Sequence, residues 1–298
     1  MKMHHRSTGF RNFVEDLARE IPSMNGLPCH LRRVRITLSM RGSVAAYAEP
    51  SLSRVAFSRA TRRFVEEVLV EGSQDSEKLA QDRAREQADI LAHELLHIRF
   101  DARQAEKNID AEILLPGLHD LDEALTTLLS RQVVPQVLTR LGIHSGEEVA
   151  TKQIPQDRVN DYEYVIVPLL KHAIGQSAKK KGVSEKELLD TLGAADTVLK
   201  AAYILFQPFF AGDWMMQVHS LRGFFGIFDC ASHELEAYVR NVKAGREQVL
   251  SLNDVESRCQ DITSTYTGLM DKLLHGSMKQ VHSSHEEPIP QKGIETIH

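Results

Sequence analysis

A nine-residue stretch, residues 90–98, constrains this chain more than any other part of it. It reads Ile-Leu-Ala-His-Glu-Leu-Leu-His-Ile, so that His93 and His97 stand four positions apart. On an α-helix, side chains four positions apart lie one above the other on the same face. The two imidazoles can therefore bind one metal ion together. The apolar residues around them predict a helix that is buried on its other sides.

Glu94 follows the first histidine and lies about 100° further round the helix. From there its carboxylate can reach a water molecule beside the metal and take a proton from it. The stretch thus reads His-Glu-x-x-His with uncharged intervening and flanking residues, and in this it resembles the active-site helix of the zincin metallopeptidases. The resemblance implies a Zn²⁺ cofactor, His93 and His97 as ligands, Glu94 as general base, and a peptide or protein substrate.

A catalytic zinc site needs a third protein ligand and one position left open for water. Glu123 is the first candidate, because it opens a helix after a Pro-Gly loop in an arrangement that resembles the gluzincins. Glu236 is an alternative, since several zincin families place a ligand glutamate on such a downstream helix. Glu112 is a second alternative, although only 15 residues separate it from His97, which leaves a short path for the chain to return to the metal. Asp101 is too close to His97 on the same helix to complete a tetrahedral site, unless that helix ends at Phe100.

A group that stabilises the oxyanion completes sites of this kind. If the helix that carries Glu236 lies at the metal, Tyr238 and His233 are the candidates for this role. Histidines near an apolar segment more often satisfy their hydrogen bonds within a core, and that interpretation stays open.

The predicted fold class is α+β, with a small zincin-like N-terminal sheet and the active-site helix followed by a mostly α-helical C-terminal part. Apolar residues at helical spacing predict helices over residues 10–21 and 76–100. Strand-like patterns occur between them at residues 31–40, 44–48 and 54–58. Pro50 confines the second strand to a sheet edge. Residues 44–49 can therefore bind extended substrate by strand addition, or form a plain edge strand.

Composition divides the chain into three parts. Residues 1–141 form the predicted zincin-like catalytic domain, and residues 142–275 form a helical subdomain that covers or completes the cleft. An aromatic and Met-rich segment, residues 203–228, predicts the core of this subdomain or the apolar wall of a cleft. Residues 276–298 lack apolar periodicity and are expected to be a disordered tail.

Charge and cysteine usage limit the classes of partner and compartment. A net charge of -5 in 298 residues argues against a dedicated nucleic-acid surface. The apolar runs are too short to cross a membrane, and the N-terminus has no apolar leader segment. Three widely spaced cysteines, Cys29, Cys230 and Cys259, fit a reducing compartment. We therefore expect a cytoplasmic protein, and the oligomeric state is left open.

Two other functions stay open at this point. The chain can be an inactive or non-peptidase zincin-like protein that binds zinc, in which case an inactive protein would keep its cellular effect after the Glu94→Gln substitution. It can also be a helical interaction protein in which the motif occurs by chance, and such a protein would bind no stoichiometric metal.

Overall fold

The computed structural model of the chain describes residues 2–24, 35–38, 46–49, 54–71, 78–98, 115–143, 165–209, 214–247 and 252–275. Within these ranges a small mixed sheet is combined with a majority of helices, which agrees with the predicted α+β class. The predicted tail, residues 276–298, and residues 144–164 at the start of the predicted helical subdomain lie outside the described residues. The division into domains stays a prediction.

The sheet has three strands in the order β1-β3-β2. β1 (Arg35–Leu38) is parallel to β3 (Arg54–Phe57), and β2 (Ala46–Glu49) is antiparallel to it. Each strand overlaps one of the segments in which the alternating or β-rich pattern predicts a strand. Among the described residues β2 is an edge strand, as predicted from the proline that follows it.

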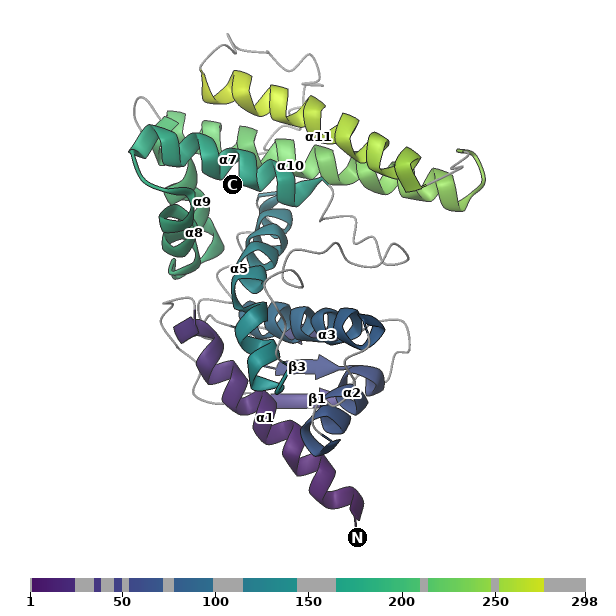
Figure 1. Cartoon of the computed structure of the whole chain (residues 1–298). Helices are drawn as coiled ribbons and strands as arrows, with labels where there is room; N and C mark the ends of the chain where they lie inside the picture. The colour runs from purple at the N-terminus through teal and green to yellow at the C-terminus, as the bar shows by residue number, and fades with distance from the viewer. Residues whose placement is uncertain are drawn as a thin grey trace, which may run out of the picture.

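The helices of the N-terminal part bury their apolar stripes against this sheet and against one another. α1 (Lys2–Met24) begins before the predicted start at residue 10. Its Phe10 ring meets Phe57 of β3 edge-on, with centroids 6.0 Å apart. α2 (Arg59–Glu71) packs against α1, and α3 (Lys78–His97) packs against α1 and β2. Figure 1 shows α3 lying along the sheet.

The C-terminal part is helical throughout its described residues. Its elements are α7 (Ile166–Lys181), α8 (Glu185–Gly193), α9 (Val198–Phe206), the 3₁₀ turn η4 (Gln207–Phe209), α10 (Trp214–Lys243) and α11 (Leu252–Leu274). Phe206 and Phe224 stack with centroids 3.9 Å apart, and both are almost fully buried. Phe225 and Phe228 are buried beside them. These aromatic residues therefore belong to the hydrophobic core.

No helix among the described residues has both the length and the apolarity needed to cross a bilayer.

α5 (Leu118–Arg140) joins the two parts. Figure 1 shows it running from the sheet-bearing part to the layer of long helices that contains α7, α10 and α11. It contacts α3, α7 and α10, and it is buried on most of its sides. Helices of this kind carry apolar residues all round rather than on one stripe. The position of α5 relative to α3 is therefore fixed by packing on several faces.

The start of α5 is pressed against the backbone of α10. Gly117, the residue before the helix, has a φ of 84°. A Cβ at this position would overlap the carbonyl oxygen of Phe225 and lie 3.0 Å from the backbone nitrogen of Asp229. Only glycine meets both conditions, because it alone adopts positive φ without cost and has no side chain to exclude the neighbouring helix.

We expect Gly117→Ala to lower the free energy of unfolding by roughly 2–4 kcal/mol, because the substitution adds backbone strain and overlap with α10. Gly182→Ala is the matched control, since Gly182 has a φ of 70° but a Cβ added there would have no neighbouring atom within 4 Å. The control should cost only about 1 kcal/mol. Denaturant unfolding measures both. Equal losses for the two variants would contradict the close approach of α5 to α10.

Candidate metal centre

α3 presents one apolar and one polar face, and the polar face carries the motif. Its predicted packed stripe is buried in full: Ala84, Ala88, Leu91, Leu95 and Ile98. His93 and His97 lie on a different face, and the helix ends at His97. A histidine in the last turn is favoured there when protonated, because the C-terminal end of a helix carries partial negative charge. The helix thus fixes both imidazoles on the side that faces α5.

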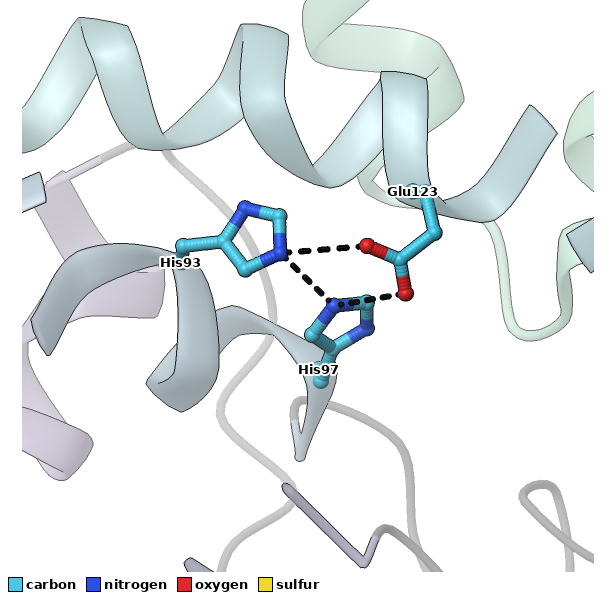
Figure 2. Close-up of side chains that lie close together, drawn as sticks. All are labelled: His93, His97 and Glu123. Atoms are coloured by element: carbon cyan, nitrogen blue, oxygen red, sulfur yellow. Dashed lines mark hydrogen bonds and ion pairs between the residues drawn. The ribbon is translucent and has the colours of Figure 1, made fainter. Parts of the chain in front are cut away.

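Glu123 of α5 lies opposite the two histidines. Its Oε2 is 3.3 Å from His93 Nε2, and its Oε1 is 3.3 Å from His97 Nε2. The two Nε2 atoms are 3.0 Å apart. Figure 2 shows the imidazoles rising from α3 and the carboxylate descending from α5 toward them. Two imidazole nitrogens of α3 and the two carboxylate oxygens of Glu123 on α5 therefore face one another.

This spacing fits a tetrahedral metal. Zinc bonds of about 2.0–2.1 Å to nitrogen and oxygen place neighbouring ligand atoms about 3.3–3.4 Å apart. The two Nε2 atoms are 3.0 Å apart, and each lies 3.3 Å from a different oxygen of Glu123, so these separations are close to that value. Two imidazoles and one carboxylate are also a set that catalytic zinc sites use. His93, His97 and Glu123 can thus hold a metal ion, and the third-ligand candidate Glu123 stands where a ligand is needed.

A second carboxylate of α5 holds the other nitrogen of His97. Asp122 Oδ2 lies 3.4 Å from His97 Nδ1. A carboxylate in this position fixes the ring orientation and directs Nε2 at the metal. Sequence reasoning missed Asp122. In the sequence, Asp122 is notable only as the neighbour of Glu123. Its role can be inferred only from a structure in which α5 crosses the end of α3.

The electrostatics of the cluster follow from burying opposite charges together. Burial alone would lower the pKa of His97, but hydrogen bonds with Asp122 and Glu123 outweigh it and raise that pKa to about 10. Burial alone would raise the pKa of Glu123, but hydrogen bonds from His93 and His97 bring it well below its usual range. The carboxylate is therefore ionised, as a metal ligand must be.

Glu94 occupies the position next to the first ligand and is partly buried. Burial raises its pKa, while positive charge on His97 and His93 acts in the opposite direction. Glu94 follows His93 by one residue, so its side chain leaves the helix about 100° away from that imidazole. Its carboxylate can therefore contact a molecule bound beside a metal rather than the metal itself.

Two other residues predicted for the site, Glu236 and Tyr238, belong to α10. Glu236 is exposed on α10 and does not belong to the group of ligand atoms around the histidines. Tyr238 is buried, and the charged groups that act on it include Glu247 and Asp254, not the motif. Among the described residues, Glu123 of α5 and not the alternative Glu236 lies beside the two histidines. Glu112 and Asp101 lie outside the described residues.

His233 is the remaining oxyanion candidate. It is exposed on α10, and its Nδ1 lies 2.8 Å from the carbonyl oxygen of Asp229. That hydrogen bond, together with the charge of Asp229, raises its pKa, and Asp120 at the start of α5 contributes in the same direction. His233 therefore lies on the side of α10 that faces the beginning of α5, and it is not a member of the ligand cluster found among the described residues.

Comparisons of this chain with family models, curated proteins and solved structures gave no match. Its function must therefore be inferred from the side chains of the site.

Substitution of the third ligand should remove the metal. We expect tag-free wild-type protein to contain one zinc ion per chain by elemental analysis, and His97→Ala and Glu123→Ala to contain almost none, because each loses one of three protein ligands. Glu236→Ala is the matched control and should keep its zinc. Loss of zinc from the control, with retention in Glu123→Ala, would show that the ligand assignment is wrong.

Asp122→Asn tests the support of His97. The amide keeps the shape of the side chain but loses the negative charge that orients the ring, so we expect zinc affinity to fall about 10–100-fold with the site still able to fill. Competition with a chromophoric chelator measures this. Affinity equal to that of the wild type would mean that the contact with His97 Nδ1 contributes nothing to the metal centre.

Proposed function

We propose that this chain is a zinc-dependent metallopeptidase of the zincin type. The convergence of His93 Nε2, His97 Nε2 and the Glu123 carboxylate, 3.0 to 3.3 Å apart beside Glu94, carries this proposal. If the His-Glu-x-x-His pattern occurred by chance in an interaction helix, no third ligand would be expected beside it. Here Glu123, 26 residues after His97 in the sequence, lies beside both histidines. The protein ligands leave one tetrahedral position for water or substrate.

Zinc in this position would polarise a substrate carbonyl and lower the pKa of a coordinated water molecule. Glu94 would be placed to accept a proton from a water molecule that attacks the scissile carbonyl, and to return that proton to the amine nitrogen as the carbon–nitrogen bond breaks. His93 and Glu123 bind from opposite helices, and Asp122 holds the His97 ring in the orientation that binding needs.

The edge strand supports a peptide rather than a small-molecule substrate. β2 lies at the edge of the order β1-β3-β2 and packs against α3, the helix that carries Glu94. Its side away from β3 has no strand partner among the described residues. An extended peptide can hydrogen-bond along such an edge. We therefore propose that substrate binds in extended form beside β2.

The free thiols of Cys230 and Cys259 support a reducing compartment. On this ground we propose a cytoplasmic enzyme. We further propose that its substrate is a peptide or protein and that it acts on a narrow range of targets. The mostly helical C-terminal part supports the site through α5, which contacts α10.

Glu94→Gln separates catalysis from metal binding. The substitution removes the base but none of the ligands, so we expect unchanged zinc content and a fall in kcat/KM of about 10²–10⁴-fold on a fluorescence-quenched peptide library. Glu236→Gln should cleave like the wild type, because Glu236 is exposed and outside the cluster.

The same assay distinguishes the alternative. A wild-type protein that contains zinc but hydrolyses nothing in the library, and whose cellular effect survives Glu94→Gln, would be an inactive zincin-like binding protein.

A further inference from the structure

A further titratable side chain, the exposed His119, lies beside Glu123 and has no part in the mechanism above. It belongs to the first turn of α5, four residues before Glu123, so the two share one face of the helix. Its Nε2 is 4.0 Å from Glu123 Oε1. The same oxygen lies 3.3 Å from His97 Nε2. One carboxylate oxygen thus has a buried imidazole and an exposed imidazole as neighbours.

His119 differs from the three ligands in exposure. Its side chain is 60% exposed, against 8% for His97, 19% for His93 and 25% for Glu123. The buried side chains are held by the packing of α3 against α5. An exposed side chain loses little when it changes rotamer, because it gives up few packing contacts. His119 therefore has room to turn while the ligands stay in place.

His119 is close to Glu123 but lies outside the group of ligand atoms that are all within 4.8 Å of one another. A change of its side-chain rotamer is therefore what would bring the imidazole to a metal held by the other three. In a tetrahedral centre the ligand atoms lie about 3.3–3.4 Å apart. The present 4.0 Å between His119 Nε2 and Glu123 Oε1 exceeds this by less than one ångström.

We propose that His119 is a reversible fourth ligand of the metal centre, and this inference rests on the metal site of the proposed function. With His119 bound, all four positions are filled by protein, as in structural zinc sites. Water and substrate are then excluded. With His119 released, one position is open, as catalysis requires. Peptide substrate and the His119 imidazole thus compete for the same coordination position, and the centre is closed while substrate is absent.

Cobalt substitution of the full-length protein tests this directly, since the visible absorption of Co²⁺ depends on the number and type of its ligands. We compare wild type with His119→Ala and with His119→Gln, whose amide is a poor ligand for this ion. The control is His233→Ala, which removes another exposed imidazole from a neighbouring helix; His233 is 69% exposed. All of these residues are at the surface, and circular dichroism verifies that the variants fold.

We expect both His119 variants to change the cobalt spectrum and to lower Co²⁺ affinity at least about tenfold, since a metal ligand matters no less than a group that supports one. Added imidazole should restore the wild-type spectrum to His119→Ala by occupying the vacated position. The control should keep the wild-type spectrum and affinity.

A His119→Ala spectrum and affinity identical to those of the wild type would overturn the inference and leave the three-ligand centre intact. A wild type that takes up no cobalt would overturn both this inference and the proposed metal site. If the spectrum changes as expected but no peptide is cleaved, the peptidase proposal fails and the fourth ligand stands.

Discussion

The contact between α3 and α5 at the two histidines is the interaction on which the rest of the site depends. Here His97 lies between two carboxylates, Asp122 and Glu123, and shares the second of them with His93. Partly buried charges of this kind are tolerated only when each has a partner of opposite sign. Removing one member of a buried charged pair costs about 3–5 kcal/mol, because the other is left uncompensated. The cluster therefore fixes both the separation and the register of the two helices.

The same contact continues along the helices beyond the charged cluster. The buried hydroxyl of Ser130 donates a hydrogen bond to Asp89, 2.9 Å away, and thereby joins α5 to α3 beyond the metal centre. Asp89 precedes His93 by one helical turn on the same face of α3. Apolar side chains of both helices surround the polar residues of this contact. The low polarity around it strengthens each hydrogen bond and makes the loss of any partner costly.

The C-terminal helices act on the site through α5 rather than by supplying ligands from the described residues. α10 approaches the start of α5 so closely that Gly117 is required there, and α7 packs against another face. The stacked Phe206 and Phe224 belong to the core that supports these helices. The site is built from α3 and α5, but it depends on the C-terminal helices as well. Glu123 points at α3 because α5 is packed on several sides, by α7 and α10 as well as by α3.

Much of the fold and part of the site could be predicted from the sequence by itself. Helical periodicity is local, so the spacing of His93 and His97 places both imidazoles on one face wherever the helix goes. Strand alternation, Pro50 and the buried stripe of α3 are equally local, and the structure has the corresponding elements. The choice among Glu123, Glu236 and Glu112 was not local. It depends on which distant segment crosses the end of α3, and α5 carries buried residues on nearly every side, so its apolar pattern does not reveal which face meets the histidines. Only the tertiary packing of α5 between α3 and α10 decides that Glu123 faces His93 and His97, with Asp122 beside His97 and the exposed His119 beside Glu123.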